Sequence, residues 1–516
     1  MKKQEQQTKN TETVSTLVYA YLAILFAGLP LYMQDKLVLI GNAKYLFFRN
    51  TTLTLGALIV VAALWQRIRA GKTQRENLRT GYASDPWRKT DAFLLLYLFS
   101  VIVAYVFSPC KEMAFLGYPG WYMGLLTQVL LVGIYFAVSR YYDGSKSIWW
   151  IAGIAAGIVT LIGLLNRLDI DVLGTFQGME NGEWNRTQLL STIGNNNWYA
   201  GYISVTAGIS LAAAFLGKRQ VRVLGMLGSF LFFASAITSN STTAILAACG
   251  LSLLLLLLSL RQRKQLLRAL EILMLLPLSV FMVRLLVQFH LTGLVLAGNA
   301  EKALFFTPVW YGVFAVELAG YLILLWRERR KRSDLLESGH VFRIAAGLAA
   351  EVVLVALLLG CLLVAGNLFR SEKLSEAANG RLALWKVTFL TYGKEGILFK
   401  IFGMGPDSYY YALYQWGSDA MDWINRGLLD NSVYVNAHNE WLTILVQQGI
   451  IGVIAYGGIF FTAFRNLRSS TTRDPRALAV LLGLTGYLIC SLFTFQHVLS
   501  TPFAFALLGM ARGVLL

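Results

Sequence analysis

One histidine stands where the longest polar stretch of the chain runs into an apolar segment. His438 belongs to the sequence Asn-Ala-His-Asn-Glu-Trp at 436–441, and the apolar segment behind it carries Gln-Gln-Gly-Ile-Ile-Gly at 447–452. An imidazole in the first turn of a helix can take a proton from a hydroxyl near neutral pH, and the helix dipole there favours an anion such as a diphosphate. His438 is therefore a candidate catalytic group, with Asn439 beside it as a candidate ligand. The alternative is an interfacial histidine that only bonds a loop carbonyl, and spacing alone leaves both open.

The same stretch carries an arginine and a tryptophan one helical turn apart. Arg381 and Trp385 belong to the sequence Gly-Arg-Leu-Ala-Leu-Trp, and Gly-Met-Gly-Pro follows at 403–406. A guanidinium group suits bidentate contact with phosphate oxygens, and an indole can stack on a sugar. Contact with lipid headgroups and anchoring at the interface are the alternatives for these two residues. The glycines of 403–406 are interpreted as turn residues, because no strand precedes them and no Walker lysine follows.

Two further polar clusters lie between apolar runs earlier in the chain. Three asparagines, Asn195, Asn196 and Asn197, precede one such run. One of them is expected to cap a helix, and the other two could bond sugar hydroxyls. Ser241 lies in Thr-Ser-Asn-Ser-Thr-Thr at 238–243, for which turn formation is the alternative to ligand binding. The chain has no dense cluster of metal-ligating residues, so we expect neither a metal nor another cofactor.

The elements that position these groups are expected to be membrane helices, because the 516-residue chain is 56% hydrophobic and only 14% charged. A soluble globular protein rarely has so few charges. Apolar runs of about 18 residues or more recur along the chain, and each can cross the hydrocarbon layer as a helix. We predict an all-α polytopic transmembrane bundle of about 12–14 spans. The expected spans are 16–33, 47–65, 91–108, 121–139, 148–165, 198–216, 223–238, 243–260, 269–287, 303–326, 341–364, 441–464, 477–495 and 501–514.

Basic residues set the expected orientation of these spans. The net charge is +17, and lysines and arginines gather in alternate connections, including the run at 327–332. The positive-inside rule then places both termini in the cytoplasm and the long connection outside. Topology and contact with anionic lipids explain the basicity, so membrane lipids are expected partners and nucleic acid is not. We predict N-terminal helices at 1–365, an extracytoplasmic catalytic loop with short helices at 366–440, and C-terminal helices at 441–516.

In their order and spacing, these motifs resemble the O-antigen ligase and O-antigen polymerase superfamily of bacterial envelope enzymes. The shared set is Gly-Asn-x-Asn at a helix start, a serine-rich turn, Gly-Arg-x-x-x-Trp, Gly-x-Gly-Pro, and His-Asn-x-x-Leu followed by Gln-Gly-x-x-Gly, over roughly 190–460. The resemblance implies a helical GT-C-like glycosyltransferase of the bacterial cytoplasmic membrane. It also implies an undecaprenyl-diphosphate-linked glycan as donor, a glycan or another envelope molecule as acceptor, and no metal or nucleotide sugar.

The resemblance also assigns roles to individual residues. His438 matches the loop histidine of the family and would orient or deprotonate the acceptor hydroxyl, while Arg381 matches its loop arginine and would hold the diphosphate. A single displacement would then invert the anomeric configuration. Family members often carry Ser-Arg in the serine-rich turn, whereas here Ser241 is followed by Thr242. The candidates to replace that missing arginine are Arg186, Arg284 and Arg370.

Other functions remain open from the sequence. A flippase or exporter of lipid-linked glycan would also have many spans, but a carrier should place its polar site near the membrane midplane. A peptidoglycan polymerase of the shape, elongation and division class is a second alternative, without a matching order of motifs. A structural membrane scaffold would tolerate loss of His438. Within the favoured family, the sequence leaves ligase and polymerase undistinguished.

Overall fold

The computed structural model describes residues 2–69, 85–177, 182–260, 262–297, 302, 305–329, 380–414, 422–423, 427 and 433–515. The described chain is almost entirely helical, with one two-stranded ladder in which Leu189 pairs with Asn195. It divides into two compact units. The first comprises 1–156, 383–471 and 491–516, and the second comprises 157–382 and 472–490. The division into three parts expected from the sequence remains a prediction.

Helices α8 and α18 run across the boundary between the units, and the last residue of α23, Ser491, also belongs to the first unit. The elements of the first unit are α1 (Lys2–Ala23), η1 (Ile24–Gly28), α2 (Leu29–Leu31), α3 (Ile40–Arg69), α5 (Arg88–Phe107), α6 (Lys111–Leu116), α7 (Leu125–Tyr141), the start of α8 (Ser147–Arg167), most of α18 (Arg381–Lys394), α19 (Ile397–Phe402), α20 (Tyr409–Tyr414), α22 (Glu440–Leu467) and α24 (Thr501–Leu515). The elements of the second unit are the rest of α8, α9 (Gly182–Gln188), β1 (Leu189–Leu190), β2 (Gly194–Asn195), α10 (Asn196–Leu216), α11 (Arg219–Thr238), α12 (Thr242–Ser259), α13 (Arg263–Leu273), α14 (Leu275–Gln288), α16 (Val309–Arg329) and α23 (Pro475–Ser491).

Within the described residues, ten helices are long and apolar enough to span a membrane, and three shorter apolar helices accompany them. These ten and three helices correspond to thirteen of the fourteen predicted spans, and the remaining one, 341–364, lies outside the described residues. The prediction of an all-α polytopic membrane protein is confirmed. The apolar runs predicted these spans because a membrane helix contacts lipid on one face and neighbouring helices on the opposite face. Both faces therefore need apolar residues.

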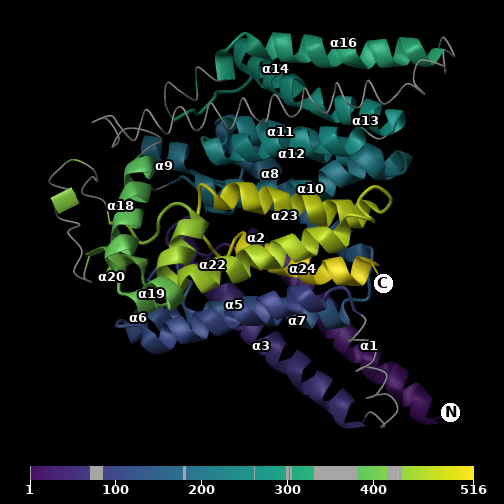
Figure 1. Cartoon of the computed structure of the whole chain (residues 1–516). Coiled ribbons are helices and arrows are strands. Elements are labelled where there is room, and N and C mark those ends of the chain that lie inside the picture. Colours follow the sequence, from purple (N-terminus) through teal and green to yellow (C-terminus); the bar gives the residue numbers. More distant parts are fainter. Residues whose placement is uncertain are drawn as a thin grey trace. The chain divides into compact units, whose positions relative to one another are not determined.

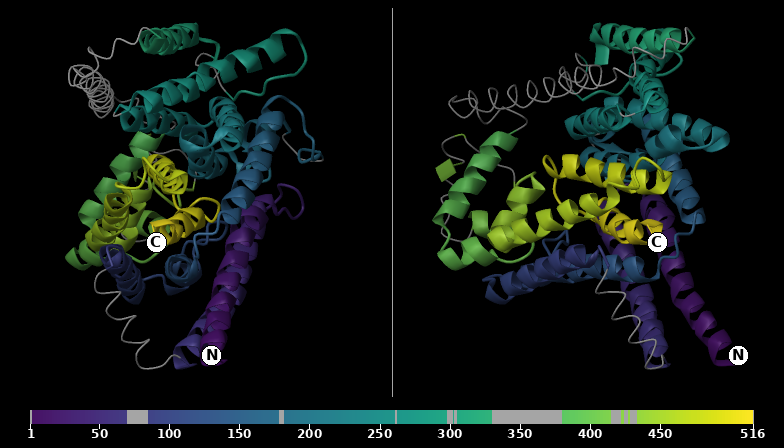
Figure 2. Two further views of the ribbon diagram at one scale, coloured as in Figure 1. Left: turned by 90° about the vertical axis from the view of Figure 1, so that its right-hand side faces the viewer. Right: turned by 45° about the vertical axis from the view of Figure 1, so that its right-hand side comes forward.

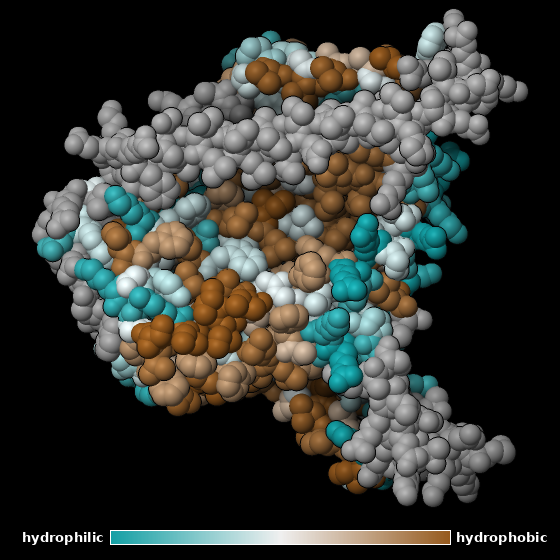
Figure 3. Space-filling model, in the orientation of Figure 1, coloured by the Kyte–Doolittle hydropathy of each residue, from teal (hydrophilic) through white to brown (hydrophobic). Residues whose placement is uncertain are grey.

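The first unit is built on pairs of neighbouring helices. α5 packs along α22, α7 packs along α24, and α1 runs beside α3 (Figures 1 and 2). Apolar side chains such as Phe99 on α5, Ile397 on α19 and Ile454 on α22 remain exposed. Figure 3 shows hydrophobic residues gathered in patches on the face turned to the viewer. An exposed apolar surface of this kind is what a lipid-facing wall requires.

The second unit is organised around α10, the most deeply buried of its long apolar helices. Two glycines allow its close packing, because a Cβ at Gly208 would meet the backbone of α23 at Gly483, and a Cβ at Gly225 of α11 would meet the backbone of Ala214. Small residues at such crossings let membrane helices approach closely. At the other end of the helix, Nδ2 of Asn196 donates to the carbonyl of Asn240 at 2.9 Å and joins the start of α10 to the turn between α11 and α12.

The long connection folds into short helices, as the sequence predicted. α18, α19 and α20 gather near the start of α22 (Figure 1). They enclose a small core of their own, in which Leu384 and Val387 of α18 pack with Met404, Tyr409 and Ala437. The connection is therefore an ordered platform over its described residues, and it carries the turn that contains His438.

Candidate functional site

The turn that presents His438 is fixed by the residues on either side of it. Asn439 caps α22, since its Oδ1 accepts the N–H of Leu442 at 3.0 Å and its Nδ2 donates to the carbonyl of Leu492 at 3.0 Å. The backbone N–H of His438 donates to Oδ1 of Asn436 at 3.0 Å. His438 has a φ of 46° and lies two residues before the helix, not within its first turn as the sequence suggested. The predicted ligand Asn439 is thus engaged as the cap.

Aromatic side chains surround this turn. The indole N–H of Trp385 donates to the carbonyl of Ala437 at 3.0 Å, and the ring centroids of Trp385 and Phe493 are 6.2 Å apart. The imidazole of His438 meets the ring of Phe495 edge-on, with 5.4 Å between centroids. Trp385 was expected to stack on a sugar or to anchor at the interface. Its indole N–H holds the backbone beside His438, and contact with a sugar stays a prediction.

Replacing Trp385 with phenylalanine should loosen the His438 turn and thereby lower any turnover that depends on His438. The variant keeps an aromatic ring at this position but loses the indole N–H and its hydrogen bond to the carbonyl of Ala437. One such bond contributes about 0.5–1.5 kcal/mol, so we expect a fall of about 2- to 12-fold in turnover. Turnover and apparent melting temperature measured side by side test this, with Trp150→Phe, a change at an exposed tryptophan, as the matched control. Equal turnover in both variants would contradict the role of the indole N–H.

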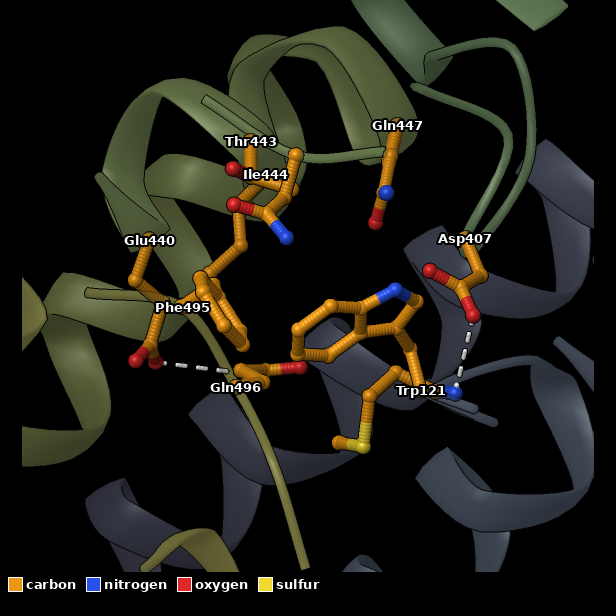
Figure 4. Close-up of a pocket in the computed structure, with 10 residues that line it drawn as sticks. Trp121, Asp407, Glu440, Thr443, Ile444, Gln447, Phe495 and Gln496 are labelled. Carbon is orange, nitrogen blue, oxygen red and sulfur yellow. Dashed lines mark hydrogen bonds between the residues drawn. The ribbon is translucent and has the colours of Figure 1, made fainter. Parts of the chain in front are cut away.

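A pocket opens beside the His438 turn, and every residue that lines it belongs to the first unit. Its volume is about 330 Å³, including the part open to solvent. Figure 4 shows polar side chains from several segments converging on it. The lining residues are Trp121 and Met123 from the connection between α6 and α7, Asp407 between α19 and α20, Asn436, Glu440, Thr443, Ile444 and Gln447 on and before α22, and Phe495 and Gln496 between α23 and α24.

Asp407 joins two walls of this pocket. Its Oδ2 accepts the backbone N–H of Tyr118 at 2.7 Å and that of Met123 at 3.0 Å. The carboxyl is buried, and burial raises its pKa from 3.8 to about 6. A left-handed backbone at Asp407, with a φ of 56°, follows the turn of 403–406 and directs the side chain inward. Sequence analysis missed this residue, because its partners lie nearly 300 positions earlier.

The raised pKa of Asp407 predicts how stability depends on pH. The folded protein favours the protonated carboxyl, so the stability that this group contributes is complete below pH 3.8 and is lost as pH rises through about 6. The difference corresponds to about 3 kcal/mol. Asp407→Asn keeps a carbonyl oxygen for the two backbone N–H groups but carries no charge. We expect it to melt at a higher temperature than wild type at pH 8 and to match it near pH 4, whereas melting curves offset equally at both pH values would contradict this. Asp35→Asn, at an exposed position, is the control.

A buried polar network extends from the pocket between the helices. Glu440 accepts a short hydrogen bond from the phenol of Tyr456 and a longer one, at 3.4 Å, from Nε2 of Gln496. Oε1 of Gln496 accepts from Gln128 at 2.8 Å, and Oε1 of Gln128 accepts from the phenol of Tyr97 at 2.9 Å. The network fixes the wall of the pocket that Glu440 and Gln496 form. Polar residues inside the apolar runs at 91–108 and 121–139 were the signal that could have found it.

Two of the glycine motifs form one structural feature. The backbone N–H groups of Met404 and Gly405 donate to the carbonyls of Val446 and Gln447 at 3.0 and 2.9 Å. Gly403 has a φ of 82° and Gly449, inside α22, a φ of 66°. The interpretation of 403 and 405 as turn residues is confirmed, and the glycine at 449 supplies the irregular helical turn against which they pack.

The amide and serine candidates lie together in the second unit. Asn195 caps α10 by accepting the backbone N–H of Asn197 at 2.8 Å, as expected, and Oδ1 of Asn197 accepts the hydroxyl of Ser241 at 2.9 Å. Ser241 directly precedes α12, and Asn240 has a φ of 58°, so the serine-rich segment is a tight turn. These contacts serve the fold, and a ligand role for the three residues stays a prediction.

The candidate arginines have protein partners wherever they are described. Arg186 forms an ion pair with Asp169, and Arg284 donates to the backbone carbonyls of Phe305 and Thr307. Arg370 lies outside the described residues. Arg381 is the first residue of α18, and its partial burial lowers its pKa.

A buried arginine that the sequence analysis did not single out stabilises this region of the second unit. Arg167 is fully buried and donates to the carbonyls of Arg186, Thr187 and Ser239, with 3.0 Å to each of the last two. It joins the segment before β1 to the serine-rich turn. Its position at the end of a predicted span was the available signal.

Comparison with known proteins bears on the segment that contains the His438 turn. Residues 303–457 match the family model described as O-antigen ligase, and no curated protein matches the chain. The matched segment includes α18, the 403–406 turn, Asp407, His438 and the first part of α22. The match over residues 303–457, together with the helical fold and multiple apolar spans, therefore supports a relation of this chain to the O-antigen ligase and O-antigen polymerase superfamily of membrane proteins.

Proposed function

We propose that this protein is a membrane glycosyltransferase that transfers or polymerises a glycan carried on undecaprenyl diphosphate, at the outer side of the bacterial cytoplasmic membrane. One observation supports this most strongly. His438 is held by a capped turn beside a polar pocket, and both lie within the segment that matches the O-antigen ligase family. The basic connections support the orientation, because they favour a cytoplasmic side opposite to the long connection.

The reaction we propose is a single displacement. The acceptor hydroxyl attacks the anomeric carbon of the donor sugar, the bond from that carbon to the phosphate oxygen breaks, and the electron pair leaves with the polyprenyl diphosphate. His438 accepts the hydroxyl proton, and the anomeric configuration inverts. A diphosphate is already a good leaving group, so the protein mainly has to position the acceptor and neutralise the developing charge. This scheme needs no metal.

Arg381 is proposed to bind the diphosphate. It stands at the first turn of α18, where the backbone N–H groups and the helix dipole also favour an anion. A hydrogen bond from a charged donor is worth about 1.5–3 kcal/mol, which is roughly a 10- to 150-fold change in binding. We expect Arg381→Ala to raise the KM for the lipid-linked donor by that factor, and Arg381→Lys to restore part of it.

The test measures release of free polyprenyl diphosphate from a polyprenyl-diphosphate oligosaccharide pool by protein in nanodiscs. Lys386→Ala, on the same helix, is the matched control and should leave the KM for the donor unchanged. Equal KM values for Arg381→Ala and wild type would remove Arg381 from the donor site. A deletion strain separates the two family activities: a preserved ladder of lipid-linked chains indicates a ligase, and single repeat units indicate a polymerase.

A further inference from the structure

The pocket beside His438 carries negative charge and has no cationic residue in its lining. Asp407 and Glu440 supply two carboxyl groups, while no lysine, arginine or histidine is among the residues that line it. Charges interact strongly in a site from which water is largely excluded. A diphosphate placed there would face two carboxyl groups without compensation, so the chemistry of the pocket disfavours the anionic part of the donor.

Several polar groups of the pocket are not used by the protein itself. The side-chain amide of Gln447 is buried, 5% exposed, and forms no hydrogen bond with another described residue. Oδ1 of Asp407 also has no partner among the described residues, because both backbone N–H groups bind Oδ2. Figure 4 shows Gln447 and Asp407 pointing toward one another across the hollow. Both groups line the hollow and leave donor and acceptor capacity there, so they are suited to a ligand that both donates and accepts hydrogen bonds.

An aromatic ring completes the pocket. The indole of Trp121 lies across the hollow, and Phe495 meets it edge-on, with 4.6 Å between ring centroids and an interplanar angle of 88°. An aromatic face accepts the C–H face of a sugar ring, while its neighbouring polar groups bond the hydroxyls. The space of about 330 Å³ includes the part open to solvent, so a ring bound there would stay partly exposed. The pocket therefore suits one sugar ring at the end of a longer glycan.

The pocket lies beside His438, and this position favours the acceptor, not the donor, as its ligand. The ring of Phe495 contacts Trp121 on one side and the imidazole of His438 on the other, with 5.4 Å between the Phe495 and His438 centroids. Asn436 lines the pocket and also accepts the backbone N–H of His438. The group that takes the acceptor proton is thus adjacent to the pocket.

We propose that the pocket formed by Trp121, Asp407 and Gln447 binds a neutral sugar ring of the acceptor glycan and excludes the diphosphate of the donor. This inference rests on the proposed function, and it adds the residues and the chemical class of the acceptor subsite. Asp407 accepts from a sugar hydroxyl, Gln447 bonds a second hydroxyl, and Trp121 packs against the ring.

The first experiment measures binding without catalysis. The probes are the neutral oligosaccharides released by mild acid from the lipid-linked pool of the host strain, with inorganic diphosphate as competitor, on the full chain in nanodiscs. We expect saturable binding to wild type that inorganic diphosphate does not displace. Asp407→Asn, Gln447→Met and Trp121→Leu should each weaken binding at least about 10-fold. The controls are Gln262→Met and Trp150→Phe, which lie outside the pocket.

The second experiment separates the two substrates in the transfer reaction. We expect the three variants to raise the KM for the acceptor and to leave the KM for the donor unchanged. Gln447→Met and Trp121→Leu should melt close to the wild-type temperature, and Asp407→Asn should melt at or above it. Absence of oligosaccharide binding to wild type, displacement by inorganic diphosphate, or an effect on the donor KM alone would overturn the proposal. Failure of the proposed function alone would give a different result. Wild type would still bind the oligosaccharide and the pocket variants would bind it weakly, but no polyprenyl diphosphate would be released.

Discussion

Replacement of His438 by asparagine is expected to lower acceptor-dependent release of polyprenyl diphosphate by about 10²- to 10⁴-fold, the usual contribution of a positioned general base. Asparagine is the informative substitution because the backbone of His438 is left-handed, with a φ of 46°. Asparagine adopts that conformation readily, whereas alanine would add backbone strain to the chemical change. The variant should therefore keep the turn before α22 and lose only the imidazole.

A second histidine in the same backbone conformation provides the control. His290 has a φ of 54° and is exposed, so His290→Asn makes the same chemical change away from the pocket. His497 is excluded as the base, because its burial lowers its pKa to about 3 and its ring nitrogens face the backbone of Leu499 and the hydroxyl of Ser500. Normal release by His438→Asn would show that the imidazole takes no part in the reaction.

Gly449→Ala is expected to destabilise the protein by about 2–6 kcal/mol, the sum of a backbone conformation that only glycine adopts easily and an overpacked contact. Gly449 combines a φ of 66° with a ψ of −171° inside α22. A Cβ there would also collide with the carbonyl of Ile401, at the place where the 403–406 turn packs against the helix. Because that turn positions Asp407, we expect the melting temperature and acceptor binding to fall together.

A substitution at another glycine of α22 is the control that distinguishes local strain at Gly449 from a general effect of alanine in this helix. At Gly457 a Cβ would meet only the ring of Trp441, at an ordinary contact distance of 3.6 Å. Gly457→Ala should leave the melting temperature and the oligosaccharide binding near their wild-type values. Equal melting temperatures for Gly449→Ala and Gly457→Ala would contradict the close approach between 403–406 and α22.

Local signals in the sequence predicted most of the helices, but they placed His438 within the first turn of a helix and not in the turn before it. A long apolar run fits few structures other than a membrane helix, and the asparagines before the run at 198–216 predicted the cap that Asn195 forms. The cap that Asn439 forms was not predicted, because Asn439 was expected to be a ligand. The glycines at 403 and 405 were identified as turn residues, since their effect is confined to the nearby backbone.

The pocket could not be predicted, because it depends on contacts between distant residues. Trp121, Asp407 and Gln447 lie in three separate segments, and each one alone looks like an ordinary residue of a connection or a helix. The hydrogen bond of Trp385 was missed in the same way, since its partner is a backbone carbonyl 52 positions away. The partner of Arg186, Asp169, is likewise set by how the connection folds.

The most direct measurement of the central claim asks whether the protein breaks the bond between glycan and polyprenyl diphosphate. Purified protein in nanodiscs is given a polyprenyl-diphosphate oligosaccharide pool and a set of acceptors, and both free polyprenyl diphosphate and glycan length are followed. We predict acceptor-dependent release with matching glycan growth for wild type, and neither for His438→Asn. No release with any acceptor, together with protein-dependent movement of intact lipid-linked glycan across a vesicle bilayer, would contradict the enzyme and identify a flippase.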